Sequence, residues 1–257
     1  MVGGAPAVLK HRRLVAFAAV AAALGAYYAW STSLPDISLW WDVAFLTFVL
    51  VPAVFTLVYL VLPLRRARGL LLLGLALGLL TWVFVEANLD ALANFAKLAA
   101  TTALAFWFVT FFDTVGLVVV VALLVPLVDA YSVWRGPTGN IVEHHPHVFT
   151  NVAFALPVPG EHDAARLGPP DLLFFAFFLV AAAQFGLRVR LTAVCLALSF
   201  GATIAIATWA ESSGLPALPG LALAFVLANA DLLWRRLREA RRSARDAPHD
   251  PGREHGP

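Results

Sequence analysis

Val128-Asp129-Ala130-Tyr131-Ser132 closes one apolar segment of the chain, and Gly168-Pro169-Pro170-Asp171 opens the next. Each segment is long and apolar enough to span a bilayer, and each carries one carboxylate. An ionisable side chain inside a spanning helix is costly, and such residues as a rule serve a function and pair with a partner. We therefore expect Asp129 and Asp171 to face each other, with the rest of the chain as their scaffold.

The composition indicates a membrane protein. The 257 residues are 61% hydrophobic and only 13% charged, with a mean hydropathy of +0.81, whereas a soluble domain carries about twice that fraction of charge. With about 20 apolar residues per span, the length allows about seven to nine helices and leaves no room for a soluble domain of normal size. The single cysteine, Cys195, excludes an intrachain disulfide.

The apolar runs predict an all-α polytopic membrane protein with about eight helices, or nine if the short turn at Asp113-Thr114 conceals a further boundary. The expected spans are Leu14–Trp30, Leu39–Leu64 with a kink at Pro52, Gly69–Val85, Ala91–Phe112, Val115–Trp134, Pro170–Leu187, Leu191–Trp209, and a last one that follows Pro216-Ala217-Leu218-Pro219 and ends at Trp234. A short β element is expected in the only long polar insert, residues 135–167.

Basic residues mark one side of the membrane. With eight spans, the clusters Lys10–Arg13, Arg65–Arg68, Arg188/Arg190 and Arg235–Arg245 all fall on the same side. Because loops rich in Lys and Arg stay in the cytoplasm, we expect a protein of the cell membrane with both termini cytoplasmic and the insert outside.

The chain divides into three parts on this basis. Residues 1–114 form a transmembrane scaffold, residues 115–234 a half that carries the aspartates, and residues 235–257 a basic tail. We expect the tail to be largely disordered beyond its first helical turns and to lie near anionic lipid head groups. Nothing in the sequence indicates nucleic-acid binding, and the oligomeric state stays open.

Two aspartates on facing helices can hydrolyse a peptide bond. One ionised carboxylate takes a proton from a water that attacks the carbonyl carbon, while the other, protonated, donates to the carbonyl oxygen. Like-charge repulsion keeps one proton on the pair. We expect no metal and no cofactor, because the stretch Glu143–His147 matches no ordinary zinc spacing and is better interpreted as a solvated loop.

The order of motifs resembles the presenilin and signal-peptide-peptidase family of intramembrane aspartyl proteases, particularly its small prokaryotic members. The Tyr-Asp motif of the family aligns with Val128-Asp129, its Gly-x-Gly-Asp motif with Gly168-Pro169-Pro170-Asp171, and its Pro-Ala-Leu motif with Pro216-Ala217-Leu218. One predicted helix separates the second and third motifs, as in the family. The resemblance, which covers residues 115–234, implies a presenilin-like arrangement in which Asp129 and Asp171 are catalytic.

The resemblance also implies the kind of substrate. A transmembrane helix would unwind before cleavage, and the outward insert, similar to that of signal peptide peptidases, implies helices of type II orientation. A strand predicted at 148–156 would pair with the unwound substrate by β-augmentation. The residues implied to contact substrate are Gly168, Pro169, Pro170, Pro216, Ala217, Leu218 and Tyr131.

Two departures from the family pattern keep another class of function open. Val128 stands in place of the tyrosine of the first motif, and Pro170 in place of the second glycine of the second motif, where it lacks a backbone N–H and has a fixed φ. The alternative is a non-enzymatic membrane protein, either a transporter that couples protons through the aspartate pair or a catalytically inactive homologue.

Other polar and small residues in or near the spans are expected to be structural. Asn229 and Asp231 are predicted to form interhelical hydrogen bonds, and Asp231 to pair with Arg235. The spacing Gly74-x-x-x-Gly78 permits close packing of two helices.

Overall fold

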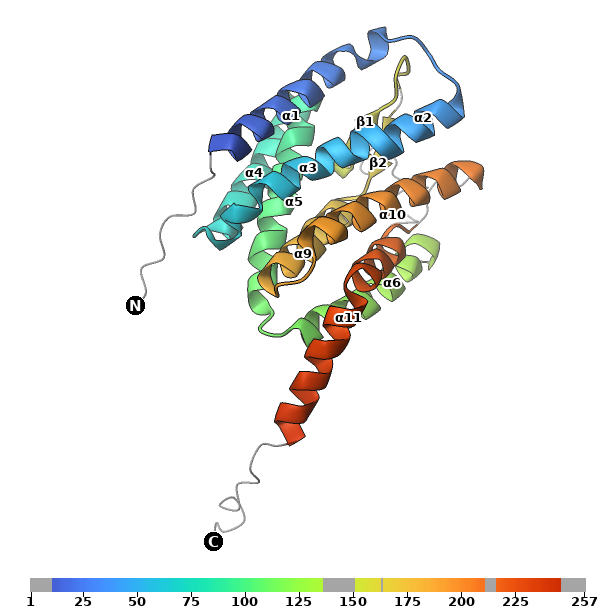
Figure 1. Ribbon diagram of the computed structural model, residues 1–257. Helices are drawn as coiled ribbons and strands as arrows, with labels where there is room; N and C mark the ends of the chain where they lie inside the picture. The colour runs from blue at the N-terminus through green and yellow to red at the C-terminus, as the bar shows by residue number, and fades with distance from the viewer. Residues whose placement is uncertain (1–10, 136–150, 163, 211–215, 246–257) are drawn as a thin grey trace.

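The computed structural model describes residues 11–135, 151–162, 164–210 and 216–245, which form a bundle of eight helical rods (Figure 1). The rods are α1 (His11–Trp30) with η1 (Ser31–Ser33), a second rod made of α2 (Leu39–Phe45), η2 (Leu46–Leu50), α3 (Val51–Val61) and η3 (Leu62–Arg66), then α4 (Leu70–Glu86), α5 (Asp90–Phe108) with η4 (Val109–Phe111), α6 (Val115–Arg135), α9 (Pro169–Gln184), α10 (Val189–Trp209) and α11 (Leu218–Arg245). Each predicted span coincides with one rod to within a few residues, except that the last rod, α11, continues past the predicted end at Trp234 to Arg245.

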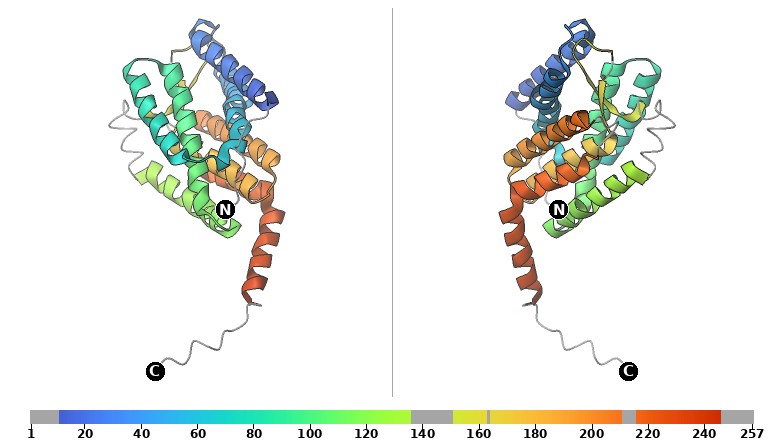
Figure 2. Two further views of the ribbon diagram at one scale, coloured as in Figure 1. Left: turned by 90° about the vertical axis from the view of Figure 1, so that its left-hand side faces the viewer. Right: turned by 90° about the vertical axis from the view of Figure 1, so that its right-hand side faces the viewer.

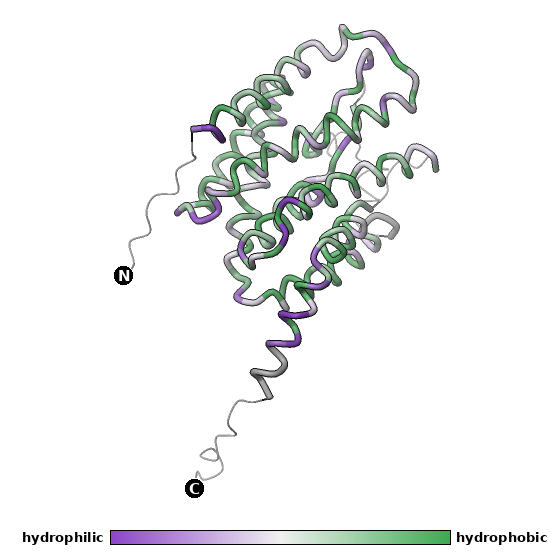
Figure 3. The backbone as a smooth tube through the Cα atoms, viewed as in Figure 1, coloured by the Kyte–Doolittle hydropathy of each residue, from purple (hydrophilic) through white to green (hydrophobic). Residues whose placement is uncertain are grey.

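The protein is an all-α polytopic membrane protein. Six rods among the described residues are long and apolar enough to cross a membrane, and α4 and α9 are shorter apolar helices. Apolar residues cover the rods between their ends, whereas polar residues gather at the ends and where α11 leaves the bundle (Figure 3). α11 continues past the bundle to Arg245 (Figure 2), so the first turns of the tail, residues 235–245, are helical as expected, and residues 246–257 lie outside the described ranges.

The second rod changes its helical geometry where the kink was predicted. Residues Leu46–Leu50 form a π-helical turn directly before Pro52. Because proline has no N–H to donate to the preceding turn, a widened turn at this place avoids an unmet hydrogen bond. The Thr56 hydroxyl donates to the Pro52 carbonyl at 2.7 Å.

α9 lies at the centre of the fold. Every residue from Phe175 to Ala182 is fully buried, because this helix is apolar all round and packs against α5, α10 and α11. Phe175 stacks on Phe55 of α3 with ring centroids 3.5 Å apart, and Phe178 stacks on Phe225 of α11 at 4.9 Å. The helix that carries the second aspartate is therefore held by helices from both halves of the chain.

α4 lies at the edge of the bundle and packs along α5. Its Leu72 is 72% exposed, as expected for a side chain that faces lipid. Gly74 approaches α5 so closely that a Cβ there would lie 2.8 Å from the side chain of Leu104. A Cβ at Gly78, in contrast, would meet no atom within 4 Å. One of the two glycines thus makes the predicted close contact.

A two-stranded antiparallel sheet forms within the polar insert. β1 (Phe154–Pro157) pairs with β2 (Ala164–Leu167), with Phe154 opposite Leu167. Both of these side chains are buried in the core, so the apolar faces of the strands fix the hairpin to the helices.

The strand predicted over 148–156 is correct only in part. Residues 154–156 are extended, but Asn151 and Val152 are helical, and residues 148–150 lie outside the described ranges, as does Glu143–His147. The second strand was not predicted.

Asn229 and Asp231 join α11 to the start of α10. Asn229 is fully buried, donates to the Thr192 hydroxyl at 2.8 Å and accepts from the backbone N–H of Arg188 at 2.9 Å, which confirms the predicted interhelical bond. The predicted pairing of Asp231 with Arg235 is wrong: Asp231 pairs with Arg188, and the closest N–O distance is 2.7 Å. Nη1 of Arg188 donates to Oδ1 of Asp231 at 2.8 Å and Nη2 donates to Oδ2 at 2.7 Å, a two-bond geometry that explains the preference for this partner.

Candidate functional site

Asp129 lies in the last third of α6 and reaches the beginning of α11, the helix alongside (Figure 1). Its Oδ2 accepts the backbone N–H of Leu218 at 3.2 Å. Leu218 is the first residue of α11, and the N–H groups of a first helical turn have no acceptor within their own helix. A carboxylate is favoured there by the helix dipole as well. The first and third motifs of the sequence are therefore in direct contact.

Asp171 is the third residue of α9 and folds back onto the start of its own helix. Its Oδ2 accepts the N–H of Gly168 at 3.1 Å, and its own N–H donates to the Gly168 carbonyl at 3.0 Å. A Cβ at Gly168 would lie 3.2 Å from Asp171 Oδ2. The glycine of the second motif thus leaves room for the carboxylate to close the first turn.

Pro170 fits this helix start without the loss of a hydrogen bond. Pro169 and Pro170 occupy the first two positions of α9, where a backbone N–H has no intrahelical acceptor. Pro219 occupies the equivalent second position of α11. Val128, the other departure from the family pattern, is 66% exposed on the surface of α6. Neither substitution disturbs the local backbone of the site.

Asp129 and Asp171 lie close enough for the charge of Asp129 to act on Asp171. Both are partly exposed, and within the described ranges neither forms a salt bridge, since the one ion pair there joins Arg188 and Asp231. No group of three or more potential metal ligands occurs in the described ranges. Chemically, the arrangement is two neighbouring carboxylates, each held by one N–H at the N-terminus of a helix. Such a pair can share a proton and bind a water.

The remaining predicted site residues fall into two groups. Pro216 and Ala217 directly precede Leu218, the first residue of α11, whose N–H donates to Asp129. Ala217 and Leu218 are buried. Tyr131 is 65% exposed. It follows Asp129 by two residues, which is about 200° around a helix, so it lies on a different face of α6 and is not brought to the pair.

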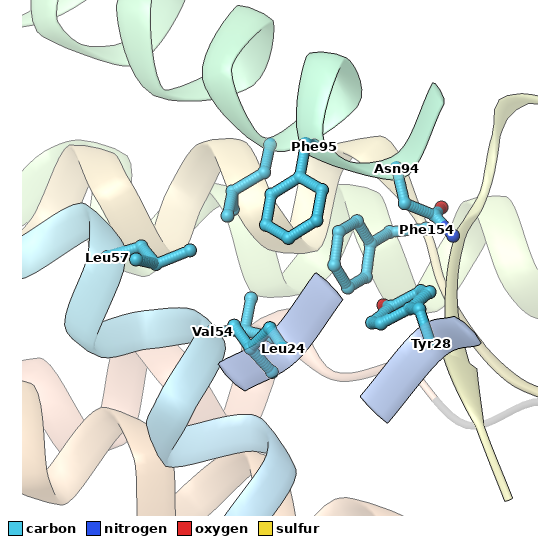
Figure 4. A pocket seen from close by; sticks show the side chains of 8 residues that line it. Leu24, Tyr28, Val54, Leu57, Asn94, Phe95 and Phe154 are labelled. Atoms are coloured by element: carbon cyan, nitrogen blue, oxygen red, sulfur yellow. The ribbon is translucent and has the colours of Figure 1, made fainter. Parts of the chain in front are cut away.

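Sequence reasoning missed a set of polar side chains that bind the hairpin from the N-terminal half. They include Tyr28 of α1 and Asn94 and Lys97 of α5. Figure 4 shows Tyr28 and Asn94 beside Phe154, at the rim of a small hollow lined mainly by apolar side chains of α1, α3 and α5. A signal was present: two polar residues three positions apart share one face of an otherwise apolar helix, and when buried they need partners.

Fold and site together define a polytopic membrane protein in which two neighbouring aspartates from separate helices each accept an N–H at a helix N-terminus. Comparison of the chain with models of known protein families, with curated proteins and with solved structures finds no match. The function is therefore inferred from the site and from the motif resemblance.

Proposed function

We propose that the protein is an aspartic endopeptidase that hydrolyses peptide bonds of transmembrane helices within the membrane, in the manner of the presenilin and signal-peptide-peptidase family. The observation that carries the proposal is that Asp129 accepts the N–H of Leu218, so that the first and third motifs are in contact, with Asp171 near enough to interact with the charge of Asp129. Bringing two carboxylates together away from water is costly, and a single shared proton removes most of the repulsion. A pair in that state offers a base and an acid side by side.

The reaction proceeds by general acid–base catalysis. The ionised carboxylate takes a proton from a water whose oxygen bonds to the peptide carbonyl carbon, while the protonated carboxyl gives its proton to the carbonyl oxygen. The carbon–nitrogen bond then breaks as the nitrogen accepts a proton, which releases an amine and a carboxylic acid. The N–H groups of Leu218 and Gly168 orient the two carboxylates. No metal or cofactor takes part.

An unwound substrate joins the hairpin at β2. The outer edge of β1, which was expected to receive it, is occupied, because Asn94 accepts the N–H of Ala155 and Tyr28 donates to its carbonyl. β2 ends directly before Gly168, so a strand added along it by β-augmentation runs past Asp171. With cytoplasmic termini, as the basic clusters predict, the substrates are helices of type II orientation.

A second candidate is a catalytically inactive homologue in which the carboxylates serve the fold. The observation that favours it is that each carboxylate accepts an N–H at the beginning of a helix. A side chain in such a position stabilises a protein by about 1 kcal/mol without any chemistry.

Binding of a transition-state mimic separates the two candidates without knowledge of the substrate. The probe is a peptide isostere whose hydroxyl replaces the attacking water, and its affinity is measured for wild type, Asp129→Asn and Asp171→Asn. The protease proposal expects saturable binding to wild type that both variants lose. Equal binding to all three proteins, or none to wild type, contradicts it.

A further inference from the structure

Four side chains of the N-terminal half hold the backbone of the hairpin at the outer edge of β1. We call this set the hairpin clamp; it consists of Tyr27 and Tyr28 of α1 and Asn94 and Lys97 of α5. Its bonds run from Tyr27 Oη to Pro157 O at 2.7 Å, from Tyr28 Oη to Ala155 O, from Ala155 N to Asn94 Oδ1 at 3.0 Å, and from Lys97 Nζ to Ala153 O at 2.8 Å. Every bond therefore ends on the backbone of β1 or of the residue just before it.

The clamp consists of polar groups that need these partners. Asn94 is 4% exposed, and Lys97 is only partly exposed in a helix of otherwise apolar character. Buried polar groups are tolerated when they are hydrogen-bonded, and here the hairpin backbone supplies the bonds. In return, the clamp covers the edge at which β1 would otherwise pair with another strand.

The turn of the hairpin is fixed as well. The Gly160 N–H donates to the Ser31 carbonyl at 2.8 Å. Gly160 has a φ of +77°, and a Cβ there would lie 2.7 Å from the backbone of Asp36. The turn thus packs directly on the connection between α1 and α2. One edge and the turn of the hairpin are immobilised by the N-terminal half, and β2 leads on to Asp171.

We propose that the hairpin clamp preorganises the sheet, so that a substrate strand meets a formed edge at β2 and is kept from β1. This inference rests on the proposed function. None of the four side chains contacts the aspartates, so they are positioning residues. Preorganisation lowers the entropy lost on binding, and loosening the clamp is therefore expected to act on KM and to leave kcat unchanged.

Hydrogen exchange tests the clamp independently of any proteolysis. Exchange is measured in detergent for peptides that cover β1 and β2, in wild type, Tyr28→Phe and Asn94→Leu. Each variant removes one bond and is expected to speed exchange there about fivefold, while Tyr59→Phe, a tyrosine of α3 beside Arg13, leaves it unchanged. Unchanged exchange in both clamp variants overturns the proposal, whether or not the protein cleaves a substrate.

Steady-state kinetics test the consequence for substrate. Tyr28→Phe and Asn94→Leu are expected to raise KM about fivefold at constant kcat, and Asn94→Asp, which keeps an acceptor atom at the same place, to restore KM. A fall in kcat at constant KM contradicts a role in docking. If wild type cleaves none of the substrates tried, the proposed function fails, and the exchange experiment alone decides on the clamp.

Discussion

Replacement of the two aspartates by asparagine and by alanine separates their structural role from their chemistry. In the wild type, Asp129 Oδ2 accepts the N–H of Leu218 at 3.2 Å, and Asp171 Oδ2 accepts that of Gly168 at 3.1 Å. Asparagine at either position keeps an oxygen that can accept the same N–H. Alanine removes the acceptor. Loss of such a helix-terminal bond costs about 0.5–2 kcal/mol, and loss of the negative charge near a helix N-terminus costs about 0.3–1 kcal/mol.

Asparagine loses only the charge, and it regains part of this loss because the repulsion between the carboxylates disappears. We therefore expect Asp129→Asn and Asp171→Asn to unfold within about 1 kcal/mol of wild type, and the alanine variants to be about 1–3 kcal/mol less stable. The assay is equilibrium unfolding in mixed micelles, followed by helical circular dichroism. Asp113→Ala, in an exposed turn, is the control and should match wild type. Asparagine variants as unstable as the alanine variants would refute the reasoning.

Three further predictions concern packing, with the same unfolding assay. Gly160 and Gly69 have nearly the same φ, +77° and +76°, but an added Cβ overlaps its neighbours only at Gly160. Gly160→Ala is therefore expected to lower the free energy of unfolding by about 1–3 kcal/mol more than Gly69→Ala. Equal losses in the two variants would contradict the packed turn. Gly74→Ala overlaps α5 and is expected to destabilise by about 1–3 kcal/mol, whereas Gly78→Ala, with nothing within 4 Å, is neutral or stabilising by up to about 1 kcal/mol; the reverse order would place the wrong face of α4 against the bundle. Asn229→Leu leaves the buried Thr192 hydroxyl and the backbone N–H of Arg188 without this partner and is expected to cost about 2–4 kcal/mol; a neutral result would show that those bonds are not formed.

The helices could be predicted because each spanning segment must satisfy its own backbone in lipid, which leaves a long apolar run as a strong local signal. The order of motifs also singled out Asp129 and the beginning of α11, which are in contact although the two residues are 89 positions apart. In that case the order of three motifs supplied the long-range information that periodicity lacks.

The rest depended on geometry that the sequence does not encode locally. β2 has four residues, Ala164-Ala165-Arg166-Leu167, too few to show alternation. Asp231 has an arginine one turn away on its own helix, but Arg188, which directly precedes α10, forms two bonds with it instead. Tyr131 was grouped with Asp129 by proximity in sequence, yet two residues along a helix turn the side chain to another face.

Cleavage of a transmembrane substrate tests the central claim most directly. The purified protein is reconstituted in liposomes with a tagged single-span helix of type II orientation, and product is measured for wild type, Asp129→Asn, Asp171→Asn and the control Asp113→Asn. We predict cleavage by wild type and the control, and a loss of about 100-fold or more in each aspartate variant. Cleavage that persists in both aspartate variants, or a wild type that cleaves none of several substrates and binds no transition-state mimic, would contradict the assignment.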